Sequence, residues 1–156
     1  FIKVSKHVTL TPAYLYLGSY GGDRPLLREH GFLNGLILSF PHKQWVVEDR
    51  NILWNRFRLH SEDIHFYRNR FRLWLPPAGH SFVIRPYLFD EVFYFINRSR
   101  WSRNRIAAGA SCDIGRNVNI DISYFQEQDH YNGSTNIVFV MGVFKFLNVK
   151  IKRIER

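Results

Sequence analysis

A short strand-like sequence occurs twice, and it constrains the fold more than any other feature of the chain. Residues 54–59 read Trp-Asn-Arg-Phe-Arg-Leu, and residues 68–73 read Arg-Asn-Arg-Phe-Arg-Leu. In each copy arginine alternates with other residues in a period of two, which indicates a β-strand with two unlike faces. One face carries the arginines and the other carries apolar side chains: Arg56, Arg58, Arg68, Arg70 and Arg72 against Phe57, Leu59, Phe71, Leu73 and Leu75.

The polar segment between the two copies, residues 60–65, is typical of a hairpin turn. A turn centred near Asp63 predicts that Arg58 lies opposite Arg68 and that Arg56 lies opposite Arg70. Like charges directly across from one another destabilise a sheet. We therefore expect these arginines to be screened by water with counterions, by carboxylates of neighbouring strands, or by an anionic partner.

The composition describes a basic domain rich in aromatic residues. The 156 residues fit a single domain, and 22 Lys and Arg against 13 Asp and Glu leave a net charge of +9. Sixteen of the 22 are arginine, which suits fixed ion pairing, stacking and phosphate contact. Phe, Tyr, Val and Ile favour strands. Affinity for nucleic acid and a merely solvated basic surface are both compatible with this charge.

Several classes of protein are excluded. Cys112 is the only cysteine, so the chain has no disulfide framework and no cysteine metal cluster. No run approaches 18 apolar residues, which argues against a transmembrane helix but not against a transmembrane barrel, whose strands need only about 9 to 11 residues. The abrupt start in strand-like residues 1–4 indicates a processed or incomplete N-terminus.

Alternating segments predict an antiparallel up-and-down meander without helices, in one domain spanning residues 1–156 that ends in a basic tail at 148–156. We expect a bulge or strong curvature at Gly31 and Gly35 and a bulge or local widening at Pro86. Loops are expected at 19–25 and 129–136. Roughly eight to ten strands are expected, a stub at 1–4 followed by strands near 8–18, 28–40, 45–59, 64–75, 81–95, 103–115, 118–124 and 137–147.

The polar faces of neighbouring strands combine into one charged surface, which is our candidate site. It holds eight positive and three negative residues: Arg56, Arg58, Arg68, Arg70, Arg72, Arg85, Arg103 and Arg105 with Glu91, Asp113 and Asp121. In a dry core each unpaired ion would cost several kcal/mol, so we expect this face to be wet.

Two architectures satisfy both faces of the strands. In a membrane barrel the apolar face meets lipid and the arginines line a hydrated lumen. In a soluble sandwich or half-open barrel the apolar face is the core, and the arginines meet nucleic acid or another polyanion. The strands at 81–95 and 103–115 exceed the usual soluble length of about five or six residues, which favours the membrane barrel.

Three segments resemble the DUF2490 family of Gram-negative outer-membrane β-barrels of unknown function. They are Tyr67-Arg-Asn-Arg-Phe-Arg-Leu73, Arg85-Pro-Tyr-Leu-Phe-Asp-Glu-Val-Phe93 and Arg103-Asn-Arg-Ile-Ala-Ala-Gly109, followed by a strand that reaches Tyr124. The resemblance covers roughly Trp54 to Phe146. It implies a small antiparallel barrel in the bacterial outer membrane, with no catalytic residues to transfer.

The functional expectation is therefore an outer-membrane barrel with an arginine-rich polar lumen, in a structural or binding role or as a narrow anion-favouring pore. A barrel of eight to ten strands is nearly filled by its own side chains, so bulk transport is not expected. A lipid hydrolase needs Ser and His on one strand face, whereas His60-Ser61 and His80-Ser81 are adjacent and would point to opposite faces. We expect no enzyme activity, cofactor or metal. The expected partners are membrane lipid or lipopolysaccharide and a larger envelope complex, rather than nucleic acid.

Overall fold

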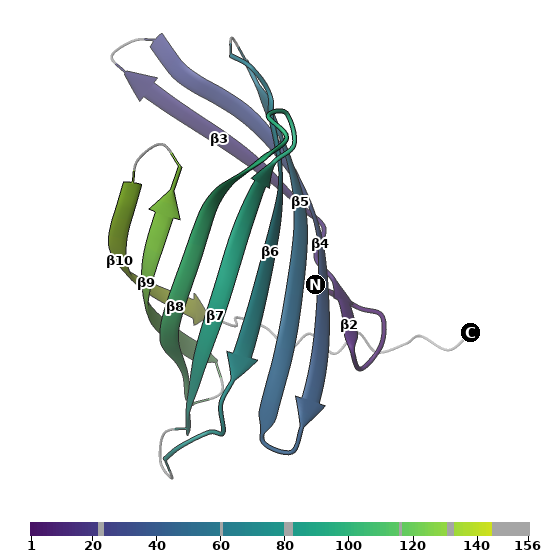
Figure 1. Ribbon diagram of the computed structural model, residues 1–156, viewed down its shortest axis with the longest axis vertical. Coiled ribbons are helices and arrows are strands. Elements are labelled where there is room, and N and C mark those ends of the chain that lie inside the picture. Colours follow the sequence, from purple (N-terminus) through teal and green to yellow (C-terminus); the bar gives the residue numbers. More distant parts are fainter. Residues whose placement is uncertain (22–23, 60, 80–82, 116, 131–132, 145–156) are drawn as a thin grey trace, which may run out of the picture.

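A computed structural model describes residues 1–21, 24–59, 61–79, 83–115, 117–130 and 133–144. Within these residues ten strands form a single twisted sheet (Figure 1). The strands are β1 (Ile2–Lys3), β2 (Val8–Leu10), β3 (Ala13–Gly21), β4 (Arg24–His42), β5 (Trp45–Arg58), β6 (Ile64–Trp74), β7 (Val83–Phe95), β8 (Arg100–Ile114), β9 (Val118–Asp129) and β10 (Gly133–Phe144). The basic tail predicted at 148–156 lies outside the described residues.

The antiparallel up-and-down order is confirmed, because each strand from β4 to β9 pairs with the next strand along the chain. Closure into a barrel is not observed. Instead the sheet ends at β10 on one side and at β1, β2 and β3 on the other, with both β2 and β3 paired to the long strand β4. In the described part of the chain no helix is long and apolar enough to span a membrane.

The predicted single strand at 8–18 is two strands, because Pro12 interrupts the ladder along β4. The pairing runs from Leu10 opposite Leu36 to Ala13 opposite Leu33. Between them the Thr11 amide still donates to the Gly35 carbonyl at 2.8 Å, whereas Pro12 has no N–H to donate. The loops predicted at 19–25 and 129–136 are also shorter than expected, because β3, β4, β9 and β10 all extend into them.

The bulges expected at Gly31, Gly35 and Pro86 are absent, because β4 pairs with β5 and β7 with β8 in unbroken register at these residues. The glycines instead permit close approach: a Cβ on Gly31 would lie 2.8 Å from Nε1 of Trp54, and one on Gly35 would lie 1.9 Å from Oγ1 of Thr11. The Pro86 carbonyl accepts from the Leu75 amide at 2.9 Å, just beyond the end of β6. Proline is tolerated there because its missing N–H faces the end of the neighbouring strand.

The core lies on the same face of the sheet as the arginines. Tyr87, Phe89, Ala107 and Phe125 form its main buried cluster, with Trp74 and Ile137 packed against it. Strand alternation places all of these side chains on the same face of the sheet as the arginine side chains of β5 to β8. The opposite face keeps large side chains open, including Phe71, Leu88, Ile106, Ile122 and Val138, each at least 48% exposed.

Candidate functional site

The predicted site residues lie on one face of the sheet, here called the arginine face. The register puts all eight predicted arginines and Glu91, Asp113 and Asp121 on this face. It also adds charged residues that sequence reasoning missed: Glu29, Glu48, Arg50, Glu127 and Asp129. The other face of β4 to β10 is called the apolar face.

The first arginine pair, Arg56 and Arg58, forms ion pairs with a buried carboxylate of β4. Arg56 donates through Nε and Nη2 to the two oxygens of Glu29 at 2.5 and 2.8 Å, and Arg58 adds a bond from its Nε at 3.0 Å. The Glu29 side chain is 1% exposed. Charge-assisted bonds of this forked kind are among the stronger hydrogen bonds in proteins. They neutralise part of the charge of the first repeat.

The second pair, Arg68 and Arg70, forms ion pairs with Glu91 of β7, and Glu91 also forms an ion pair with Arg105 of β8. Arg68 and Arg70 approach Oε1 of Glu91 through their Nε atoms at 2.5 and 2.7 Å, and Nη1 of Arg105 lies 3.4 Å from Oε2. The Glu91 side chain has no exposed surface. Three guanidinium groups therefore converge on one carboxylate, and that carboxylate cannot neutralise all of them.

The third pair, Arg103 and Arg105 of β8, meets carboxylates of β9. Nε of Arg105 lies 2.5 Å from Glu127, and Nη2 of Arg103 lies 2.9 Å from Asp129. The alternation that begins at Asp121 and Ser123 continues through Phe125 to these two acids. That alternation was the signal in the sequence that could have identified them.

Aromatic rings separate the charged groups along the arginine face. The guanidinium carbon of Arg70 lies 4.4 Å from the ring centre of Phe89, and that of Arg105 lies 4.9 Å from Phe93. Arg72 lies 4.7 Å from the ring of Tyr87 and 4.9 Å from that of Trp74. Such cation–π contacts stabilise a cation that has been partly removed from water.

Arg50 and Arg72 form no ion pair within 4 Å among the described residues. Arg50 lies directly opposite Arg70, and Arg72 is two residues further along the same strand as Arg70. The Nε atoms of both Arg50 and Arg72 are buried and have no hydrogen-bond partner in the described structure. These two guanidinium groups therefore differ from Arg68, Arg70 and Arg105, which are each bonded to a carboxylate.

These two arginines face a cavity of about 280 Å³ that strands β5 to β10 enclose. Its wall includes Arg50 and Arg72 on one side, Asp121 on β9, and Phe139 and Met141 on β10. Because strands so far apart in the sheet line one cavity, the arginine face is the inner face of a curved sheet. Asp121 itself accepts a hydrogen bond from the Tyr87 hydroxyl at 2.5 Å.

The other predicted residues do not line this cavity. Four of them belong to the ion pairs described above: Arg56, Arg58, Glu91 and Arg103. Arg85 is exposed near the start of β7, and Asp113 is exposed at the adjacent end of β8, where its carboxylate accepts from Asn119 at 3.0 Å. The structure thus brings Arg68, Arg70, Arg72, Arg105 and Asp121 into one cavity wall and leaves Arg85 and Asp113 outside it.

The predicted hairpin register is wrong. Arg70 lies opposite Arg50, Arg68 lies opposite Ile52, and Arg56 lies opposite Ile64. The turn is therefore centred near residue 60 rather than 63, and the Arg58 amide donates to the Asp63 carboxylate at 2.9 Å to close it. This shift directs the two repeats to Glu29 and Glu91 on opposite sides of the hairpin.

A polar cluster interrupts the apolar face. Asp49 accepts hydrogen bonds from Asn69 at 2.6 Å and from Asn51 at 3.1 Å, and Asp90 accepts one from Asn104 at 2.7 Å. These residues occupy the middle of β5, β6 and β7 and the first part of β8. The apolar face is consequently divided into two apolar zones.

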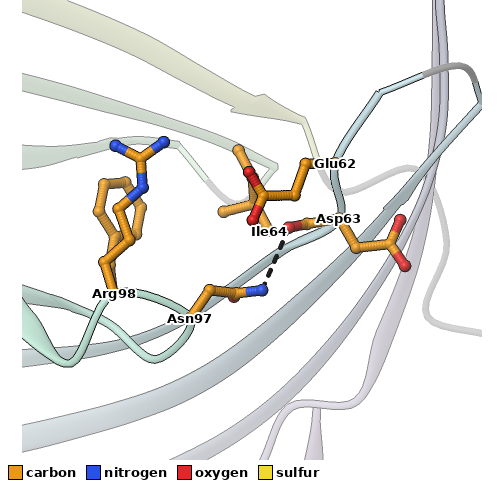
Figure 2. A pocket seen from close by; sticks show the side chains of 6 residues that line it. Glu62, Asp63, Ile64, Asn97 and Arg98 are labelled. Carbon is orange, nitrogen blue, oxygen red and sulfur yellow. Dashed lines mark hydrogen bonds between the residues drawn. The ribbon is translucent and has the colours of Figure 1, made fainter.

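A second cavity, of about 190 Å³, lies at the turns after β5 and β7. Figure 2 shows Asn97 reaching from one turn to the other, where its side-chain amide donates to the Asp63 carbonyl at 3.3 Å. The Asn97 side-chain oxygen also accepts from the His65 amide at 2.7 Å. These contacts tie the two turns together and account for the pocket as a structural feature.

Among the described residues no three His, Cys, Asp or Glu side chains come together in a group that could hold a metal ion. Of the two His-Ser pairs considered from sequence, His60 and the pair His80-Ser81 lie outside the described residues.

Residues 1–138 match the family described as "Protein of unknown function (DUF2490)". The chain belongs to the DUF2490 family. The match begins well before Trp54, so the family extends over the N-terminal strands β1 to β4 as well. No curated protein and no solved structure matches this DUF2490 chain.

Proposed function

We propose that this DUF2490 protein is a β-barrel of the bacterial outer membrane whose arginine face lines a hydrated interior, in a structural or binding role. The observation that carries the proposal is the contrast between the two faces. Large aliphatic and aromatic side chains are exposed on the apolar face, which is the outer face, while ion pairs lie on the arginine face, which is the inner face. Soluble monomers rarely expose apolar patches larger than a few hundred Å².

The arrangement of the sheet supports a membrane location over a soluble sandwich. A sandwich would cover the apolar face with a second sheet, and the described residues form one sheet only. Strands β4, β5, β7 and β8 have 19, 14, 13 and 15 residues, which exceeds the roughly 9 to 11 that a tilted membrane strand requires. In the full assembly we expect the free edges at β10 and at β1 to β3 to be paired, because unpaired backbone groups are not tolerated in lipid.

The test is the behaviour of the purified chain in detergent. We expect it to partition into the detergent phase and to migrate differently on electrophoresis before and after boiling. A chain that stays monodisperse in plain buffer, with its apolar face protected from a hydrophobic dye, would contradict the proposal.

A second candidate is a soluble domain that binds nucleic acid or another polyanion through the arginine face. The polar cluster of Asp49, Asn51, Asn69, Asp90 and Asn104 favours it, because such groups are costly against lipid. Affinity for heparin or single-stranded DNA should then fall steeply as salt rises, since phosphate or sulfate contacts release counterions. A flat salt response would remove this candidate.

A further inference from the structure

We propose that the cavity between β5, β6 and β10 binds an organic phosphate. The phosphate group would lie at the guanidinium groups of Arg50 and Arg72, and the apolar part of the ligand would lie against Phe139 and Met141. The proposal deepens the proposed function, since it requires the arginine face to be open to solutes.

The first argument is the unmet hydrogen-bonding capacity of the arginines. The Nε atoms of Arg50 and Arg72 are buried without a partner in the described structure, while the neighbouring Arg68, Arg70 and Arg105 are all held by Glu91. Buried donors without partners are rare in native proteins and call for an explanation. A rotation of either side chain toward the cavity would bring its Nε atom within reach of a bound oxyanion, which would supply the missing acceptor.

The second argument is the charge balance of the cavity wall. Five arginines line the cavity, whereas one lining carboxylate, Asp121, and two carboxylates bonded to these arginines, Glu91 and Glu127, oppose them. Two positive charges remain, and Glu48, opposite Arg72 in the register, reduces the excess to one. A phosphate ester, with a charge of about −1.5 to −2, is opposite in sign to this excess and large enough to neutralise it.

The third argument is geometric. Arg50 is directly opposite Arg70, so Arg72 is its diagonal neighbour across the strand pair. Side chains at diagonal positions are about 7–8 Å apart at their bases, within reach of one another for long side chains. Both side chains line the same cavity, and a planar guanidinium group can donate two bonds to an oxyanion.

The fourth argument concerns the rest of the ligand. Phe139 and Met141 of β10 line the same cavity and are 45% and 43% exposed. An inorganic ion would leave these apolar side chains in contact with water. An ester with an aromatic or aliphatic body covers them while its phosphate meets the arginines.

The experiment is calorimetric titration of phenyl phosphate into the full chain folded in neutral-detergent micelles. Arg50→Gln and Arg72→Gln should each weaken binding at least about tenfold, as expected for loss of a charged hydrogen-bonding partner. Arg28→Gln removes the same charge from an exposed position outside the cavity and should change binding less than about twofold. If all three variants lose the same affinity, the binding reflects the overall positive charge of the protein rather than this cavity, and the proposal is overturned.

Further ligands define the chemistry and its source. Phenol should not bind measurably, and inorganic phosphate should bind more weakly than phenyl phosphate. Equal binding of phenol and phenyl phosphate would overturn the phosphate assignment. Phosphatidic acid in mixed micelles tests whether the ligand is a lipid. If the original chain binds this lipid and Arg50→Gln weakens that binding, the ligand is a lipid headgroup. If the chain binds phenyl phosphate but not phosphatidic acid, the ligand is a soluble ester.

Folding of the variants and the location proposal are checked separately. Without phosphate, Arg50→Gln should resist urea at least as well as the original chain, because it removes repulsion from Arg70. Marked destabilisation would show that Arg50 has a structural partner and would overturn the site. Detergent partition without phosphate binding contradicts the cavity proposal alone, whereas a chain that is monodisperse in plain buffer contradicts the membrane proposal.

Discussion

Glu91 connects three strands through a single carboxylate. Its oxygens meet Arg68, Arg70 and Arg105, and the side chain has no exposed surface. A buried ion is tolerated only when its partners are close and well oriented, because its desolvation is costly. The three arginines in turn depend on Glu91, since without it their charges would repel one another across β6 and β8.

We therefore expect Glu91→Gln to destabilise the folded protein by about 3–5 kcal/mol, the usual result of removing one partner from a buried ion pair. The measurement is urea-induced unfolding in micelles, with the free energy extrapolated to water. Glu62→Gln is the control, because Glu62 is exposed in the turn after β5 and should change the free energy by less than about 0.5 kcal/mol. Equal stability of the two variants would show that Glu91 is not the centre of the network.

Gly109 provides a second test at the residue scale. A Cβ at this position would lie 2.5 Å from Cζ of Tyr87 and 2.8 Å from the Ile122 carbonyl oxygen. Gly109→Ala should displace the Tyr87 hydroxyl from Asp121 and cost about 1–3 kcal/mol, as overpacking of a core does.

Gly142→Ala is the matched control for this change. Its Cβ would meet only the Phe144 ring at 3.5 Å, an ordinary contact, so its midpoint of thermal unfolding should stay near that of the original chain. If both alanine variants unfold at the same temperature, the close packing of Tyr87 over Gly109 is refuted.

At the level of the strands, the hairpin of β5 and β6 places each arginine repeat beside a different acid. The repeats suggested mirrored pairing, but a hairpin register depends on the turn and on which face is buried rather than on sequence similarity between its arms. The turn closes near residue 60 through the Asp63 carboxylate. The first repeat therefore reaches Glu29 on β4 and the second reaches Glu91 on β7.

The register can be tested with paired cysteines in a Cys112→Ser background. Leu53 lies opposite Tyr67, so Leu53→Cys with Tyr67→Cys should form a disulfide under mild oxidation. Leu53→Cys with Phe71→Cys is the control, because it shares the face but is four residues away along β6. Cross-linking of the control pair in preference to the first would contradict the register.

At the scale of the whole molecule, the curvature of the sheet determines which face is inner and which is outer. Figure 1 shows β10 on one side of a single curved layer and β4 and β2 on the other. The inner face combines the aromatic core with the ion pairs, and the outer face leaves aliphatic side chains open. Membrane strands need this division, with polar groups toward the interior and apolar groups toward lipid.

Leu88→Arg tests this division. Leu88 is 48% exposed on the apolar face, so arginine there would be nearly harmless in a soluble protein. In a bilayer near its midplane the substitution should cost about 2–4 kcal/mol, measured as unfolding from lipid vesicles. Asn117→Arg, at an exposed turn between β8 and β9, is the control and should stay within about 0.5 kcal/mol. Equal stability of both variants in vesicles would argue that the apolar face does not meet lipid.

The sequence alone determined the strands and their two faces. A period of two places the arginines of β5, β6 and β8 on one face, because successive side chains in an extended chain point to opposite sides. The family resemblance and the antiparallel order also followed from it. Glu91 and Asp121 were identified in the same way, since each shares the alternation of neighbouring polar residues.

Only the tertiary structure decided how the strands align and what each charge meets. Glu29 lies 27 residues from Arg56, and Glu127 lies 22 residues from Arg105, so no local pattern links them. The register, the open edges at β3 and β10, and the curvature depend on pairing between distant segments. That pairing leaves Arg50 and Arg72 without an ion pair within 4 Å among the described residues, while Glu91 bonds to Arg68, Arg70 and Arg105.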